Sequence, residues 1–228
     1  MPIIGTQQSP IQIMHEQTFH AHFPFSYFEI DRYEVEGDVE GVFEDHNFDF
    51  NTPPKGLTFN REPWYLHKMH LHAPAEHLIN SYAPNHFELH LVHYQSDKPH
   101  PTGPKVVISA MFEIAKENLK EIKNRHSFHH LNKFHKDMTK KKTKKCYPPL
   151  EEPTHLINPN DFLPDCTSRW YHYQGSLTSG TYSEDCDWFV LDDKFQVCES
   201  HVQFLCETKQ KARPIHALDR RFILRNFE

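Results

Sequence analysis

Apolar and polar residues alternate with a period of two along much of the chain. The alternating runs are short and are separated by turn-rich segments such as NTPPKG (51–56) and SDKPHPTGP (96–104). This pattern is typical of antiparallel strands that bury one face. We expect strands at FSYFEIDRYEVEG (25–37), GVFEDHNFDF (41–50), YLHKMHLH (65–72), FELHLVHY (87–94), KVVISAMFEI (105–114), WYHYQG (170–175) and DWFVL (187–191).

Two further segments carry apolar residues at helical spacing, AKENLKEIKN (115–124) and CESHVQFLCETK (198–209). The sequence therefore predicts a mainly β (α+β) fold. We expect a single domain over residues 1–228, built around a large twisted, mostly antiparallel central sheet with short peripheral helices. The lysine-rich run 136–146 is interpreted as a solvated basic surface loop, with a surface for an anionic partner as the alternative.

Charge and composition exclude several classes of protein. The chain has 25 basic and 31 acidic side chains and a net charge of −6, which argues against a general nucleic-acid binder. No segment approaches the ~18 consecutive apolar residues of a membrane span, and the first residues do not resemble a secretory signal. The oligomeric state is not indicated.

Five cysteines are present, and an odd number without a signal sequence favours free thiols. A local bridge between Cys186 and Cys198 is the alternative. We therefore expect a cytoplasmic protein, with secretion or the periplasm as the alternative locations.

The histidines are numerous, and two strands place some of them together. Alternation puts His70 and His72 on one face of the first strand, and Glu88, His90 and Val92 on one face of the next. If these strands are neighbours, three neutral imidazoles converge, which suits Zn²⁺ with water as the fourth ligand. Glu88 is positioned to accept the remaining N–H of His90. On spacing alone, the alternative is a set of surface histidines on an exposed sheet.

Longer motifs decide between these interpretations. The stretches QSPI (8–11), HLHAPAEH (70–77), ELHLVH (88–93), YQGSLTSGTYSE (173–184) and ARPIHALDRR (212–221) occur in the order found in α-class carbonic anhydrases. The chain resembles this family from Gln8 almost to its C-terminus, and the HAPAEH form resembles its bacterial members. The resemblance implies a carbonate dehydratase, a zinc lyase that converts CO2 to bicarbonate and a proton.

By this resemblance His70, His72 and His90 bind zinc. In carbonic anhydrases zinc lowers the pKa of a bound water from about 15.7 to about 7. Thr178 matches the family threonine whose hydroxyl donates to a carboxylate, here Glu76, and so orients the nucleophile toward CO2.

The resemblance also assigns a proton shuttle and a substrate pocket. His46, in EDHNFDF, matches the histidine that carries the proton out of the cleft, because an imidazole can take up and release protons near neutral pH. Ser179 takes the place of a second threonine. An apolar wall for CO2 is expected from Val92, Ile108, Leu177 and Trp188.

Several positions depart from the family pattern. Lys68 replaces a glutamine that accepts a hydrogen bond from the first zinc histidine, and lysine offers only donors. Lys211 replaces the asparagine of the family's NxRP motif. The cysteine pair of secreted members is absent, which supports a reducing compartment or a different pattern of bridges.

The competing hypothesis is a carbonic-anhydrase-like binding or adhesion protein with weak or no catalysis. Such relatives typically lose zinc histidines, whereas this chain keeps all three, so the sequence favours the enzyme. Hydrolysis of small esters is expected as a side activity of the same site.

Overall fold

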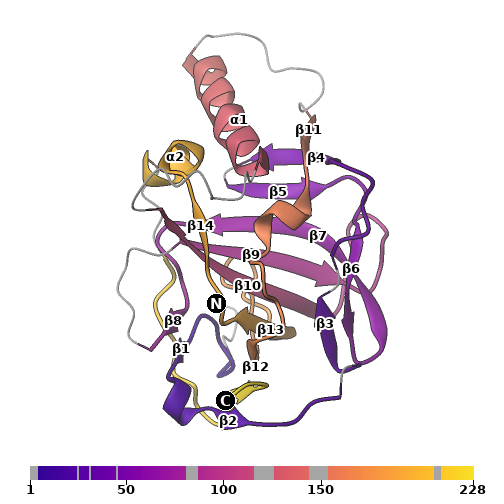
Figure 1. The fold of residues 1–228 in the computed structure, drawn as a ribbon, viewed down its shortest axis with the longest axis vertical. Helices are drawn as coiled ribbons and strands as arrows, with labels where there is room; N and C mark the ends of the chain where they lie inside the picture. Colours follow the sequence, from indigo (N-terminus) through magenta and orange to yellow (C-terminus); the bar gives the residue numbers. More distant parts are fainter. Residues whose placement is uncertain are drawn as a thin grey trace.

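A twisted sheet of 13 strands forms the centre of the molecule (Figure 1). The computed structural model describes residues 5–24, 26–30, 32–44, 46–80, 87–115, 126–143, 154–207 and 212–228. The sheet contains β2 (Phe19–His20), β3 (Phe28–Ile30), β4 (Val39–Glu44), β5 (Asn47–Phe50), β6 (Lys55–Phe59), β7 (Glu62–His72), β9 (Phe87–Tyr94), β10 (Lys105–Ile114), β11 (Thr154–Ile157), β12 (Trp170–Gly175), β13 (Cys186–Leu191), β14 (Phe195–Val197) and β15 (Leu224–Arg225).

The order of the main path is β11-β4-β5-β7-β9-β10-β13-β12-β15-β2. Off this path, β14 pairs with β10, β6 pairs with β7, and β3 pairs with β6. Most neighbours are antiparallel, whereas β10 pairs in parallel with β13 and β14, and β15 pairs in parallel with β2. Two short strands, β1 (Gln12–Ile13) and β8 (Leu78–Ile79), form a separate parallel pair. The predicted mainly β fold around one large sheet is confirmed.

Strand boundaries differ from the sequence-based expectation at two places. Only Phe28–Ile30 of the predicted strand 25–37 is β3. The predicted strand 41–50 is a hairpin, in which β4 turns into β5 with Glu44 opposite Asn47. His46 lies in this turn with φ of 66°, a left-handed conformation that uniform strand alternation does not anticipate.

Two α-helices and two 3₁₀ turns accompany the sheet in the described part of the chain. They are α1 (His126–Thr143), α2 (Glu199–Glu207), η1 (His15–Gln17) and η2 (Pro159–Phe162). The predicted helix near the C-terminus is confirmed by α2, whereas residues 116–124 of the other predicted helix lie outside the described residues. Neither described α-helix is long and apolar enough to cross a membrane.

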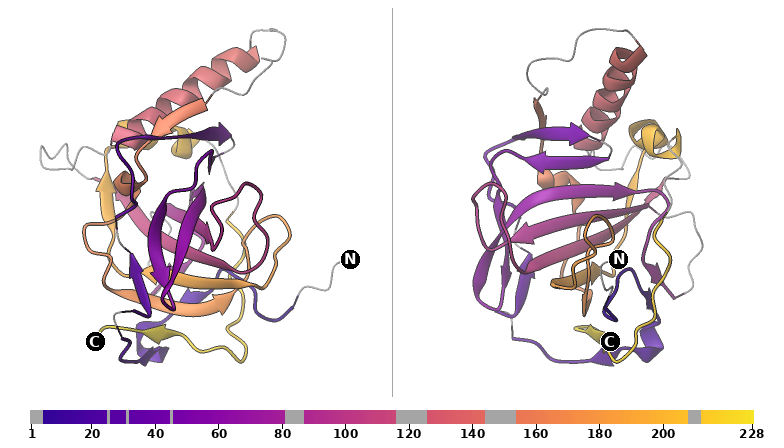
Figure 2. Two further views of the ribbon diagram at one scale, coloured as in Figure 1. Left: turned by 90° about the vertical axis from the view of Figure 1, so that its right-hand side faces the viewer. Right: turned by 180° about the vertical axis from the view of Figure 1, so that it is seen from behind.

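Helix α1 corrects the expectation of a basic loop at 136–146. The helix runs through this segment as far as Thr143 and projects from the body beside β11 and β4 (Figure 2). Residues 136–143 contain neither glycine nor proline, and lysine is a good helix former, so nothing in the run ends a helix. Residues 144–146 lie outside the described part.

Both faces of the central sheet are covered by apolar side chains. Strand alternation sends Ile108 and Phe189 into one core cluster and Val107 and Trp188 into another. His70 and His72 of β7 and His90 of β9 share the second face with Val107 and Trp188, whereas His93 of β9 lies on the first face, where it contacts Tyr33. Figure 1 shows β7, β9, β10 and β13 crossing the middle of the molecule, so this face belongs to the central strands of the sheet.

Candidate active site

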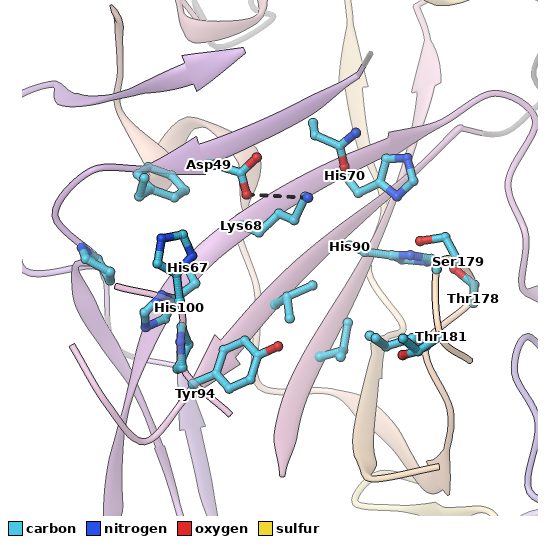
Figure 3. A pocket seen from close by; sticks show the side chains of 18 of the residues that line it. Asp49, His67, Lys68, His70, His90, Tyr94, His100, Thr178, Ser179 and Thr181 are labelled. Atoms are coloured by element: carbon cyan, nitrogen blue, oxygen red, sulfur yellow. Dashed lines mark ion pairs between the residues drawn. The ribbon is translucent and has the colours of Figure 1, made fainter. Parts of the chain in front are cut away.

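The three histidines predicted as metal ligands come together on neighbouring strands. Strands β7 and β9 are antiparallel, with His70 directly opposite His90 and His72 opposite Glu88. The ring centroids of His70 and His72 lie 4.1 Å apart, and those of His72 and His90 lie 4.3 Å apart. His72 and His90 are buried, whereas His70 is half-buried and faces a cleft (Figure 3).

The donor atoms at this position fit a metal ion. Potential ligand atoms of His72, Glu76 and His90 all lie within 4.8 Å of one another. Nε2 of His72 and Oε2 of Glu76 are buried without a hydrogen-bond partner, which is costly unless another group binds them. His70 is not part of this compact group, although its ring is adjacent to that of His72.

The electrostatic environment favours neutral rings at two of the histidines. Burial lowers the pKa of His70 to about 3, with smaller contributions from neighbouring positive groups that include His90 and Lys68. Burial, and then His90 and His70, hold the pKa of His72 well below its usual range. A metal ion binds the neutral imidazole, so these shifts leave the rings in the form that binds.

Glu88 holds the third histidine, as predicted. Its Oε1 accepts hydrogen bonds from Nε2 of His90 at 2.7 Å, Nδ1 of His77 at 2.6 Å and Oγ of Ser109 at 2.6 Å. Burial alone would raise the pKa of Glu88, but His77 and His90 lower it well below its usual range. Burial likewise opposes protonation of His90, and the carboxylate of Glu88 outweighs it and raises the pKa of His90. Since Nε2 of His90 faces Glu88, Nδ1 is the atom left for a ligand.

The other oxygen of Glu88 fixes the turn that carries Glu76. Oε2 of Glu88 accepts the backbone N–H groups of Glu76 at 2.7 Å and His77 at 2.8 Å. On its far side, Nε2 of His77 lies 2.6 Å from the hydroxyl of Tyr173. One buried carboxylate therefore orients both a candidate ligand and the neighbouring acidic residue.

Glu76 itself is tied to the C-terminal motif. Its Oε1 accepts the backbone N–H of Arg213 at 2.9 Å, and the guanidinium of Arg213 donates to Oε1 of Gln8 at 2.7 Å. Oε2 points toward Nδ1 of His72 at 3.5 Å and Nδ1 of His90 at 4.0 Å. The motifs around Gln8, Glu76 and Arg213 thus form one connected support.

Thr178 lines the cleft and is nearly buried. Because Oε2 of Glu76 has no hydrogen-bond partner, the predicted bond from the Thr178 hydroxyl is not formed at that atom. Two residues before Thr178 the backbone is anchored at Ser176, whose Oγ accepts the N–H of Ser9 at 3.0 Å and whose carbonyl oxygen accepts the indole N–H of Trp188 at 3.0 Å.

The cleft has a volume of about 820 Å³ and an apolar wall. Of the predicted pocket residues, Val92, Leu177, Ser179 and Trp188 line it. Ile108 does not, because strand alternation turns it into the opposite core, where it is fully buried. Its neighbour Val107, which pairs with Val92 across β10 and β9, lines the cleft instead.

His46 lies elsewhere than the resemblance implied. It is only 3% exposed, and its ring contacts Phe204 of α2 at 5.5 Å and His135 of α1 at 6.1 Å between centroids. It is not among the residues that line the cleft. The two helices cover this turn and pack the ring between them, so the expected position of His46 part-way up the cleft is wrong.

Several cleft residues were not expected from the motifs. His67, Tyr94 and His100 lie on one side of the cleft (Figure 3), and Asp49 faces Lys68, with 3.4 Å between Oδ1 and Nζ. No family motif marks His67 or His100. The pairing of β7 with β9 shifts register between Leu66 and Lys68, and strict alternation along β7 does not predict such a shift.

The remaining departures from the family pattern concern two lysines and the cysteines. Lys68 lines the cleft beside His70, as its place in the strand requires. Lys211 lies outside the described residues. In the described part of the chain Cys166, Cys186, Cys198 and Cys206 are free, so no bridge joins Cys186 to Cys198, and Cys146 lies outside this part.

Comparison with known proteins identifies the class of this fold and site. The solved α-carbonic anhydrase of Photobacterium profundum superposes with a TM-score of 0.70 at 26% identity, covering 97% of this chain and 90% of that one. The chain is 25% identical to "Alpha carbonic anhydrase 3" of Arabidopsis thaliana over 82% of its length, and 28% identical to "Carbonic anhydrase Nec1" of Nesocodon mauritianus over 72%. It spans 64% and 56% of the lengths of these two curated relatives.

The model of the eukaryotic-type carbonic anhydrase family matches residues 3–226. The chain belongs to this family, whose members are zinc-dependent. The expectation that bacterial members are the nearest relatives is not confirmed, since the similar proteins include plant as well as bacterial ones.

Proposed function

We propose that this protein is an active zinc carbonic anhydrase that converts CO2 and water to bicarbonate and a proton. The observation that carries the proposal is the compact, buried group of His72, Glu76 and His90 beside an apolar-walled cleft that His90 lines. In this group Nε2 of His72 and Oε2 of Glu76 have no hydrogen-bond partner. Family membership supports the same reaction class.

Three rings would hold the metal: His70, His72 and His90. Nε2 of His72 has no other partner, and His90 offers Nδ1 because Glu88 occupies its Nε2. His70 completes the set from the next position along the same face of β7. Zn²⁺ held there would act as a Lewis acid on a bound water, lowering its pKa toward neutrality and supplying the nucleophile for CO2.

Glu76 and Thr178 would orient that nucleophile. Oε2 of Glu76 is free to accept a hydrogen bond from the Thr178 hydroxyl, because Arg213 already occupies Oε1. A threonine that donates to a carboxylate has only lone pairs left for the reacting group, which fixes the direction of attack.

The apolar wall would hold CO2 next to this group. Val92, Val107, Leu177 and Trp188 present hydrocarbon surface on one side of the cleft. A nonpolar gas gains from contact with such a surface, whereas the charged product is expelled toward the polar side.

The test is zinc quantification and stopped-flow CO2 hydration on the same preparation. We expect about one zinc per chain and rapid hydration, with both lost in His72→Asn and zinc binding weakened in His70→Asn. His20→Asn, on the edge strand β2, is the matched control and should retain both. A folded protein that takes up no zinc after incubation with the ion would overturn the proposal.

A binding protein of the same fold is the second candidate. The feature that favours it is Lys68, a cation beside His70 where the family pattern has an amide, together with the position of His70 outside the compact ligand group. The same experiment separates the two, because a binding protein would be folded, free of zinc and inactive toward CO2. Ester hydrolysis, measured on 4-nitrophenyl acetate, should follow zinc content if it is a side activity of this site.

A further inference from the structure

Hydration of CO2 releases a proton at the floor of the cleft, and that proton must reach the solvent. His46, buried between α1 and α2, does not line the cleft. Besides the candidate ligands His70 and His90, the cleft is lined by two imidazoles, those of His67 and His100, on the side away from Thr178 (Figure 3).

A β-bulge directs His67 into the cleft. The pairing of β7 with β9 shifts register between Leu66 and Lys68. Leu66 and Met69 both belong to the core, three positions apart, so His67 and Lys68 both face the cleft. An unbroken strand would have turned His67 away from Lys68. Bulges of this kind commonly re-aim a side chain beside an active site.

The hydrogen bond of His67 determines which nitrogen is available. Nε2 lies 2.5 Å from the backbone carbonyl oxygen of Ser96. A carbonyl can only accept, so Nε2 carries the hydrogen and Nδ1 is left as the acceptor. The ring is further fixed by an edge-on contact with Tyr94, with centroids 5.3 Å apart. The ring of His67 is thus fixed in orientation, and its Nδ1 remains available to accept a proton.

His100 provides the next step toward solvent. It is exposed, lies in the loop that follows β9 and has φ of 53°. The charged groups at this part of the cleft are Asp49 of β5 and Lys68 of β7, which pair with each other, and the phenol of Tyr94 comes from β9. A proton placed on His67 therefore meets no unpaired cation among these cleft residues.

We propose that His67 is the acid–base residue that relays the proton out of this cleft, with His100 as its outlet; this rests on the proposed carbonic anhydrase function. Three strand positions separate His67 from His70, about 10 Å at ~3.3 Å per residue, so the transfer passes through intervening water. One O–H bond of the reacting water breaks, and one N–H bond forms at Nδ1 of His67. The imidazolium then loses that proton to His100 or to buffer, which restores the neutral ring.

The kinetic test compares His67→Asn and His100→Asn with wild type in low and high buffer. We expect CO2 hydration by His67→Asn to fall on the order of 10-fold in low buffer, to recover with added imidazole, and to show an unchanged rate of CO2–bicarbonate interconversion in ¹⁸O exchange. His46→Asn is the matched control, since asparagine tolerates positive φ, and should match wild type in low buffer.

A second measurement does not depend on activity. In the metal-free protein at high pH, long-range ¹H–¹⁵N spectra should show the Nε2–H tautomer of His67, and the Nδ1–H tautomer would overturn the assignment. An active wild type with no loss in His67→Asn would overturn the relay alone. A zinc-loaded wild type without activity would overturn the proposed function and the relay with it.

Discussion

Nε2 of His90 lies 2.7 Å from Oε1 of Glu88, two residues earlier on the same face of β9. The same carboxylate is fully buried and accepts four further hydrogen bonds, from His77, Ser109 and the backbone of the turn at Glu76. The position of the candidate ligand and the position of the neighbouring acid are therefore set by a single side chain.

Replacing Glu88 by Ala should destabilise the fold and weaken zinc binding together. The change leaves several buried donors unpaired, for which we expect a loss of about 3–5 kcal/mol in the free energy of unfolding. In the milder Glu88→Gln variant, zinc affinity should fall about 10–100-fold, because His90 loses its anionic acceptor. Urea unfolding and chelator competition measure the two effects. Glu62→Gln, an exposed residue of β7, serves as the control, and an unchanged affinity in Glu88→Gln would contradict the role given to Glu88.

Replacing Lys68 by Gln should strengthen zinc binding. Lys68 places a positive charge beside His70, whereas glutamine would remove that charge and offer an acceptor. The ion pair with Asp49 is exposed, so its loss should cost at most ~1 kcal/mol. We expect an affinity gain on the order of 10-fold by chelator competition. Lys55→Gln, which breaks the similarly exposed pair with Glu34, is a matched control and should show no gain.

Thr178 offers a test of orientation that is separate from metal binding. Thr178→Val keeps the shape and removes the hydroxyl, so CO2 hydration should fall on the order of 100-fold with zinc content unchanged. Thr178→Ser restores the hydroxyl and should recover most of the rate. Equal rates in the valine and serine variants would show that the hydroxyl has no part in the reaction.

Acid should destabilise the protein through its buried neutral histidines, of which His93 is the clearest case. Burial lowers the pKa of His93 to about 3, and its ring bonds the Tyr33 hydroxyl at 2.9 Å and the Val106 carbonyl at 3.2 Å. The unfolded chain takes up this proton below about pH 6.5, whereas the folded chain excludes it until about pH 3. The stabilisation is therefore complete above pH 6.5 and is lost progressively as the pH falls toward 3.

Urea unfolding of the metal-free protein between pH 7 and 4.5 measures this dependence. His93→Gln should be less stable than wild type at pH 7 and should lose less stability on acidification. His22 is exposed and follows β2, so His22→Asn should show the same dependence of unfolding free energy on pH as wild type. If the free energy of unfolding falls equally with pH in His93→Gln and in wild type, the acid sensitivity arises from other groups.

The sequence allowed the face that carries the candidate metal ligands to be predicted because its signal is local. His70, His72, Glu88 and His90 follow strict alternation on two strands with no irregularity between them. Ile108 was misplaced by one residue, since the run VVI (106–108) is apolar on both faces of the strand and gives no alternation from which to choose a face.

Other parts of the site depend on packing that alternation does not encode. The bulge at His67 has no marker residue such as glycine, so the face of that side chain follows only from the pairing of β7 with β9. His46 is buried because α1 and α2 cover its turn, which is a long-range contact. Local patterns cannot report such contacts.

Gln8 and Arg213 are 205 positions apart in the sequence, and the same arginine supplies the N–H that holds Glu76. During synthesis the N-terminal part of a chain emerges first, so the Gln8 motif waits for a partner that is added 205 residues later. A nascent chain that ends before Arg213 lacks the N–H that donates to Oε1 of Glu76. The support of the Glu76 carboxylate is therefore completed only after both ends of this 205-residue separation have been synthesised.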